Sequence, residues 1–178
     1  VQLMGGEIGV ESALGKGSTF WFIVSLAKQE SDSIELSTKD TAFTAEQRLK
    51  ANFAGTRILL AEDEPITQEI SRCLLEDVEL EVDIAENGQQ ALALSKQHIY
   101  ALILMDMQMP KLNGVEATKA IRGDSLNIAT PILAMTANAF DEDRQICLEA
   151  GMSDHIAKPV VPDRLYEILL QWLEKRGN

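Results

Sequence analysis

From residue 57 onward, short apolar runs alternate with segments in which apolar residues recur every three to four positions. The first pattern predicts β-strands and the second predicts amphipathic helices. The expected strands are Ile58–Ala61, Leu80–Ala85, Ala101–Met105, Ile132–Met135 and His155–Ala157. A helical segment follows each strand, so the pattern predicts an α/β domain whose parallel sheet is covered by helices on both faces.

The composition of the strands predicts their order in the sheet. The third and fourth strands, "ALILM" and "ILAM", are almost wholly apolar, which is typical of strands buried on both faces. The second, "ELEVDIA", alternates acidic and apolar residues, which suits a strand at an edge. We therefore expect five parallel strands in the order 2-1-3-4-5, a doubly wound, flavodoxin-like fold.

Start signals support two of the helices. Pro65 suits the first turn of the first helix, in which Ile66, Ile70 and Leu74 share one face. Asn113 and Glu116 have the spacing of a capping box, which places the start of the third helix.

Residues 1–55 have a different character from the rest of the chain. The alternation of residues 1–26 predicts a β-hairpin with strands Glu7–Ser12 and Thr19–Leu26 around a glycine-rich turn. Two strands alone are not a stable unit, so we expect the edge of a larger domain. Residues 27–55 are polar and without a sustained period, which predicts a linker with a short helix around Ala45–Asn52. The α/β domain is then expected over 56–178.

Charge and composition exclude several classes of protein. With 46% hydrophobic residues the chain can bury a core, and a net charge of −12 argues against a nucleic-acid partner. No apolar run approaches the roughly 20 residues that cross a bilayer, and no signal peptide is visible, so we expect no direct membrane contact. We expect Cys73 and Cys147 to be buried thiols rather than a disulfide or metal site. Because Val1 begins in mid-pattern, we expect a segment of a longer protein.

Polar residues follow four of the five strands at their carboxyl ends, where ligands bind in doubly wound sheets. These residues are Glu62, Asp63, Asp106, Thr136 and Lys158. Each is ordinary by itself, but their joint occurrence is hard to explain as turns and caps. Three neighbouring carboxylates repel one another unless a hard cation binds them, and Mg²⁺ suits such a site. The set resembles a phosphoryl-transfer site with Asp106 as the nucleophile.

Four motifs over residues 57–174 resemble the receiver domain of two-component response regulators: "LLAEDE", "LILMDMQMPKLNG", "ILAMTANAF" and "GMSDHIAKPV". The resemblance implies that Asp106 accepts a phosphoryl group from a phosphohistidine. It implies that Asp63 binds Mg²⁺ directly, Glu62 through water, and Gln108 through its backbone carbonyl. Thr136 and Lys158 are then expected to sense the phosphoryl group.

Two positions depart from the commonest receiver pattern, and two others are expected to affect the rate of dephosphorylation. Glu62 stands where many receivers have Asp, and His155 stands where a Tyr or Phe often acts as a rotating switch residue. The resemblance places Gln108 and Asn138 at the positions that tune dephosphorylation.

The stretch "MGGEIGVESALGKGSTFWF" resembles the end of a histidine-kinase ATPase domain. The upstream parts of an ATP site are missing, and the only histidines, His98 and His155, are not in a phosphorylatable helix. We therefore expect no kinase activity from this chain and a hybrid sensor histidine kinase as its parent. The implied partners are a histidine kinase dimerisation domain or a histidine phosphotransfer domain. The implied location is the cytoplasm, with the parent anchored in the inner membrane. The sequence does not indicate an oligomeric state.

Three other classes compete with this interpretation. A phosphatase of the haloacid dehalogenase type needs Asp-x-Asp, but Gln108 occupies the second position. A flavodoxin needs a phosphate loop after the first strand, where Glu-Asp-Glu-Pro would repel FMN phosphate. A pseudo-receiver that docks without being phosphorylated stays open.

Overall fold

In the computed structural model the chain forms two compact units, Val1–Ala42 and Phe43–Asn178. The structure describes residues 7–13, 17–23, 43–137 and 141–176.

The first unit contains the predicted hairpin, formed by β1 (Glu7–Ala13) and β2 (Gly17–Ile23). The strands are antiparallel, and the register pairs Ile8 with Phe22 and Val10 with Phe20. This register puts four apolar side chains on one face of the hairpin, and all four are more than half exposed. Such a face is typical of a sheet that packs against another layer. The end of the predicted second strand, residues 24–26, lies outside the described residues.

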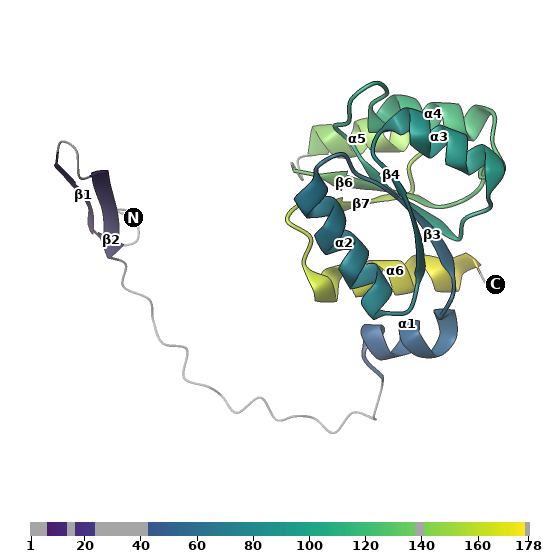
Figure 1. The fold of residues 1–178 in the computed structure, drawn as a ribbon, viewed down its shortest axis with the longest axis horizontal. Coiled ribbons are helices and arrows are strands. Elements are labelled where there is room, and N and C mark those ends of the chain that lie inside the picture. The colour runs from purple at the N-terminus through teal and green to yellow at the C-terminus, as the bar shows by residue number, and fades with distance from the viewer. Residues whose placement is uncertain (1–6, 14–16, 24–42, 138–140, 177–178) are drawn as a thin grey trace. The chain divides into compact units, whose positions relative to one another are not determined.

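The second unit has a five-stranded parallel sheet in the order β4-β3-β5-β6-β7, which confirms the predicted 2-1-3-4-5 order (Figure 1). Its strands are β3 (Arg57–Ala61), β4 (Glu81–Ala85), β5 (Leu102–Asp106), β6 (Ile132–Thr136) and β7 (Asp154–Ala157). The two strands predicted to be buried, β5 and β6, are buried at every position. The alternating strand β4 lies at the edge, as predicted.

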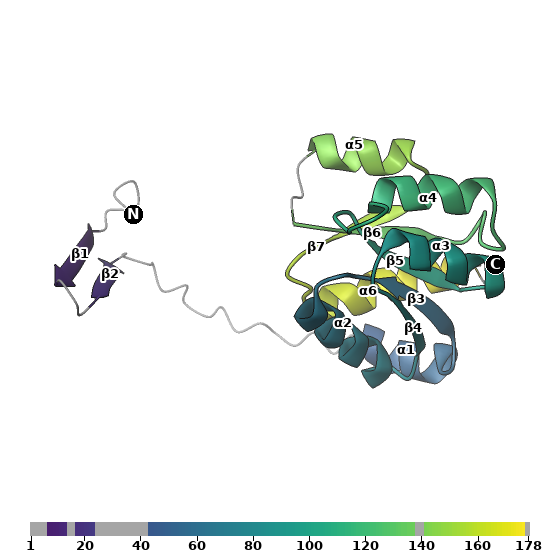
Figure 2. The same cartoon turned by 45° about the horizontal axis from the view of Figure 1, so that its top comes forward.

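Helices cover both faces of the sheet, as Figure 2 shows. They are α1 (Ala45–Phe53), α2 (Pro65–Asp77), α3 (Gly88–Gln97), α4 (Gly114–Gly123), α5 (Asp141–Glu149) and α6 (Pro162–Arg176). Helices α1, α2 and α6 share one apolar cluster with the sheet, and α3, α4 and α5 share the other. Alternate residues of β3 enter different clusters: Ile58 and Leu60 the first, Leu59 and Ala61 the second. A strand that contributes to two cores must be apolar throughout.

The helix starts agree with the sequence, whereas the apolar face noted in the first helix, α2, is largely exposed. Pro65 is the first residue of α2, and Asn113 forms the predicted capping box with Glu116. However, Ile66 and Ile70 are 69% and 51% exposed. Helix α2 instead turns Ser71 and Leu75 towards the core. Two apolar residues four positions apart can lie on the buried face of a helix or on an exposed face beside it, and in α2 Ile66 and Ile70 lie on the exposed face.

The second unit begins earlier than the predicted boundary at residue 56. Helix α1 packs against α6, with Leu49 fully buried and Arg48 paired with Glu174. The sequence pattern was too short to show this packing, because Leu49 and Phe53 are the only large apolar residues of the helix.

The two cysteines differ in exposure. Cys147 is buried as expected, whereas Cys73 is exposed on α2, so the prediction was wrong for that thiol. Among the described helices, none combines the length and the apolar character needed to cross a membrane.

Candidate functional site

The polar residues expected at the strand ends come together in one pocket of the second unit. Glu62 and Asp63 follow β3, Asp106 and Thr136 end β5 and β6, and Lys158 follows β7. All five line the same pocket at the carboxyl edge of the sheet. The sheet order explains this convergence. Strands β3 and β5 are neighbours at the point where the strand order reverses, which is where ligands bind in doubly wound sheets.

Three carboxylates form the acidic part of the pocket. One oxygen from each of Glu62, Asp63 and Asp106 lies within 4.8 Å of the other two. Glu62 is fully buried and Asp106 is 6% exposed, whereas Asp63 is exposed. An all-oxygen, multiply charged donor set suits a hard divalent cation, and the residues present therefore fit Mg²⁺.

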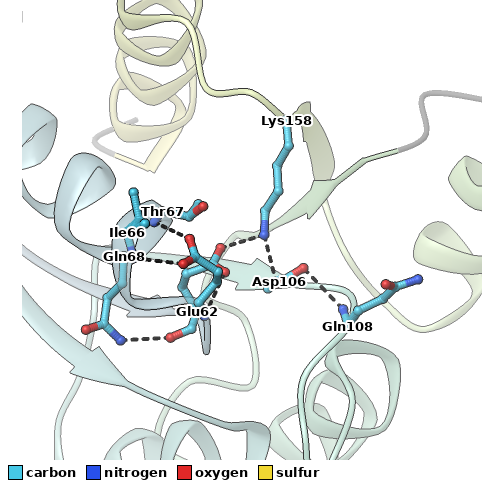
Figure 3. A network of polar contacts seen from close by, with 8 residues as sticks. Glu62, Ile66, Thr67, Gln68, Asp106, Gln108 and Lys158 are labelled. Atoms are coloured by element: carbon cyan, nitrogen blue, oxygen red, sulfur yellow. Dashed lines mark hydrogen bonds and ion pairs between the residues drawn. The ribbon is translucent and has the colours of Figure 1, made fainter. Parts of the chain in front are cut away.

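Lys158 reaches into the acidic cluster and pairs with two of its members (Figure 3). Its Nζ lies 2.8 Å from Asp106 Oδ2 and 2.6 Å from Glu62 Oε2. Burial lowers the pKa of Lys158, but its hydrogen bond to Asp106, its close ion pair with Glu62 and the charges of both carboxylates raise that pKa above the ordinary value. The lysine therefore stays charged at neutral pH.

Burial acts in the opposite sense on Glu62. It raises the pKa of the Glu62 carboxyl above the ordinary value, and the nearby charge of Asp106 adds to the rise, although Lys158 opposes both. A buried carboxylate is costly unless a cation or hydrogen bonds compensate it. Lys158 thus supplies a countercharge for this side chain.

Backbone N–H groups hold the two buried carboxylates in place, and one side chain holds the backbone of Glu62. The backbone N–H of Gln108 donates to Asp106 Oδ1 at 3.1 Å, and that of Glu64 donates to Glu62 Oε1 at 3.3 Å. The side-chain amide of Gln68 donates to the Glu62 carbonyl at 2.8 Å (Figure 3). Gln68 could not be predicted from the sequence, since nothing in its spacing shows which carbonyl a polar residue near the start of a helix will reach.

Glu64, which was not among the predicted site residues, caps α2. Its carboxylate accepts hydrogen bonds from the backbone N–H groups of Ile66 and Thr67. The hydrogen bonds to Thr67, and then that to Ile66, lower the pKa of Glu64. An acidic residue directly before a proline that opens a helix was the available signal.

Gly114 lets α4 begin directly against the backbone of Asp106. A Cβ at this position would lie 2.2 Å from the Asp106 carbonyl oxygen, closer than any side chain tolerates. The Gly114 N–H also donates to the carbonyl of Met107 at 3.1 Å. The glycine therefore helps to set the position of the strand end that carries Asp106.

Gly114→Ala is expected to lower the free energy of unfolding by about 1–3 kcal/mol, because the new methyl group must displace backbone rather than a flexible side chain. Urea denaturation would measure the change. Gly123→Ala is the matched control at the other end of α4, where an added Cβ meets nothing within 4 Å. It is expected to be neutral or to stabilise by up to about 1 kcal/mol. Equal effects of the two substitutions would contradict the close approach at Gly114.

The remaining predicted site residues differ in placement. Thr136 is buried at the pocket, as its place at the end of β6 requires. His155 lies on β7 outside the residues that line this pocket, and its Nδ1 is 3.5 Å from Asp154 Oδ1. Asn138 lies outside the described residues. The switching role of His155 and the tuning roles of Gln108 and Asn138 stay predictions.

The sequence model of the response regulator receiver domain matches residues 58–170. The chain belongs to this family. Its curated relatives include the autoinducer 2 sensor kinase/phosphatase LuxQ of Vibrio vulnificus (strain YJ016), 36% identical over 172 residues, which are 97% of this chain and 19% of LuxQ. The sensor histidine kinase AruS of Pseudomonas aeruginosa is 37% identical over 171 residues, which are 95% of this chain and 16% of AruS. The chain thus spans less than a fifth of these relatives.

Solved receiver structures resemble the second unit. The receiver domain of the sensor histidine kinase PA1611 from Pseudomonas aeruginosa, with a magnesium ion coordinated in its active-site cleft, is 40% identical. It matches with a TM-score of 0.64 over 68% of this chain and 99% of that domain. The receiver domain of Ssk1 in its complex with the histidine phosphotransfer protein Ypd1 of Saccharomyces cerevisiae is 29% identical. Its TM-score is 0.66, over 71% of this chain and 94% of that one. The predicted receiver family and fold are confirmed.

Proposed function

We propose that this receiver domain accepts a phosphoryl group from a phosphohistidine onto Asp106, with Mg²⁺ bound, and changes conformation in response. The observation that carries the proposal is the setting of the Asp106 carboxylate. One of its oxygens is held by the Gln108 N–H and the other by Lys158, beside two further carboxylates. A carboxylate fixed in this way is oriented for attack and is close to both a metal-binding set and a fixed positive charge.

Mg²⁺ would be held by Asp63 and Asp106 directly, by Glu62 through water, and by the backbone carbonyl of Gln108. Bound there, it would neutralise charge on the transferring phosphoryl group. The magnesium ion of the PA1611 receiver supports this assignment.

The chain's own residues then carry out the transfer. A carboxylate oxygen of Asp106 forms a bond to phosphorus while the bond between phosphorus and the donor imidazole nitrogen breaks. A donor ring that carries a proton on its other nitrogen then leaves as a neutral histidine. Lys158 offsets the added negative charge, and the Thr136 hydroxyl donates a hydrogen bond to a phosphoryl oxygen. To convert a 1:99 bias against the active state into 99:1, phosphorylation must favour that state by about 5.5 kcal/mol.

The proposed donor is a histidine kinase dimerisation domain or a histidine phosphotransfer domain. The exposed stripe of Ile66 and Ile70 supports a docking partner at this end of the molecule, because it lies on α2, whose Thr67 lines the site pocket. The complex of the Ssk1 receiver with Ypd1 is an example of such a pair in a relative.

We further propose that the parent is a hybrid sensor histidine kinase working in the cytoplasm, with residues 1–26 as the end of its ATPase domain. The alignment with LuxQ, which covers 97% of this chain, supports that arrangement because it extends through the hairpin. The exposed apolar face of the hairpin is what a fragment of a larger layered domain would present.

The proposed function is tested by intact mass measurement after incubation with acetyl phosphate, with and without Mg²⁺. The expected result is one phosphoryl adduct that requires Mg²⁺ and is absent from Asp106→Asn. The matched control is Asp124→Asn, which removes an exposed carboxylate paired with Lys96 and should leave the adduct unchanged. If neither acetyl phosphate nor a phosphohistidine donor gives an adduct on folded protein, the docking module without phosphorylation becomes the better account.

A further inference from the structure

The ammonium group of Lys158 lies between two of the three carboxylates that the proposed function assigns to Mg²⁺. Its 2.6 Å contact with Glu62 is shorter than its 2.8 Å contact with Asp106. The Lys158 side chain is 20% exposed, and that of Glu62 is fully buried. The lysine therefore already supplies, inside the site, part of the positive charge that a divalent cation would supply.

The two oxygens of Glu62 have different surroundings. Oε1 accepts the N–H of Glu64, whereas Oε2 is buried and accepts no hydrogen bond of regular geometry. The ion pair with Lys158 thus compensates the charge of Oε2. This oxygen would be left buried and uncompensated if the lysine moved away and no other cation arrived.

Glu62 stands where many receivers have Asp, so its side chain is one methylene longer than theirs. The additional methylene of glutamate carries the carboxylate further from the backbone of β3. In this structure the carboxylate meets Lys158, whose own backbone follows β7, three strands away in the sheet.

We propose that Lys158 is an internal counter-cation of the metal-free site, and that Glu62 sets the affinity for Mg²⁺ by retaining it. The proposal rests on the proposed function, since it concerns the same site. When Mg²⁺ binds, Lys158 leaves Glu62, and the free energy lost from that ion pair weakens the net binding. The released ammonium group is then free to pair with a phosphoryl group on Asp106. Glu62 thereby links metal binding to the position of Lys158.

Isothermal titration with MgCl₂ at fixed ionic strength tests the proposal on the whole chain. Lys158→Met is expected to bind Mg²⁺ about tenfold more tightly than the wild type, a difference of about 1.4 kcal/mol. Glu62→Asp should also tighten binding, by about three- to tenfold, because the shorter side chain holds the lysine less well. Lys119→Met removes an exposed lysine of α4 as the charge-matched control and should change the affinity by less than about twofold.

The double variant separates this proposal from a direct effect of Glu62 on the metal. If Glu62 acts by retaining Lys158, adding Glu62→Asp to Lys158→Met should change the affinity by less than about twofold. An equal factor in both backgrounds would overturn the proposal. If Lys158→Met does not fold, Glu62→Asp still decides, because unchanged or weaker Mg²⁺ binding by that variant contradicts retention.

A metal-free measurement gives a second readout. In EDTA, Lys158→Met should have a lower Tm than Lys119→Met, because Glu62 is left buried without a countercharge, and adding Glu62→Gln should restore part of the loss. No difference between the two lysine variants would overturn the proposal. If neither the wild type nor the control binds Mg²⁺, the proposed function fails. If both bind Mg²⁺ normally and Glu62→Asp has no effect, only the proposal about Glu62 fails.

Discussion

Asn127→Ala is expected to lower the free energy of unfolding by about 3–5 kcal/mol, an unusually large loss for a polar residue in a loop. The Asn127 side chain is fully buried. Its Oδ1 accepts the Tyr100 N–H at 2.8 Å and the Thr130 hydroxyl at 3.0 Å. Its Nδ2 donates to the carbonyls of Ser95 and His98, both at 2.7 Å. All four hydrogen-bonding positions of the amide are therefore in use.

Truncation would leave several of these partner groups buried without a hydrogen bond, and each such group costs about 1–3 kcal/mol. Urea denaturation followed by circular dichroism would measure the loss. Asn52→Ala, at an exposed position of α1, is the control and is expected to change stability by less than about 0.5 kcal/mol. A loss below 1 kcal/mol at Asn127 would show that the loop before β6 does not depend on this amide.

Leu49→Ala is expected to lower the free energy of unfolding by about 2–4 kcal/mol. Leu49 is fully buried in the cluster that α1, α2 and α6 form with the sheet, so its truncation leaves a cavity at the α1–α6 contact. The size of the effect is informative because α1 precedes the region matched by the receiver family, residues 58–170.

Chemical denaturation again measures this change, with Leu148→Ala as the matched control. Leu148 is 49% exposed on α5, so the same truncation should cost less than about 1 kcal/mol there. If Leu49→Ala is as mild as the control, α1 is only a segment of linker that rests on the domain. A large loss would establish that the folded receiver unit of this protein begins near Phe43.

The architecture could be predicted because its signals are local and redundant. Continuous apolar runs showed which strands are buried on both faces, and the alternation in β4 showed an edge. Once the order was known, the rule that ligands bind at the carboxyl ends of the strands brought Asp106 and Lys158 together without any long-range information.

The features that the sequence did not show depend on distances between elements. The pattern of α2 placed Ile66 and Ile70 on one face of the helix but could not distinguish a buried face from an exposed one, and both side chains are exposed. The close approach of Gly114 to Asp106 follows from the packing of α4 against a strand end, which no local propensity encodes. The same holds for the contact between Lys158 and Glu62, which lie 96 positions apart and meet across the sheet.

The central claim, that Asp106 carries an acyl phosphate, is tested most directly by trapping that bond. Borohydride reduces an acyl phosphate of aspartate to homoserine, which peptide mass spectrometry can locate. After incubation with a phosphodonor and Mg²⁺, the account predicts reduction at Asp106 alone, and none when Mg²⁺ is removed. Reduction at Asp63 or Glu62 instead, or none at Asp106 in protein that carries a phosphoryl adduct, would contradict it.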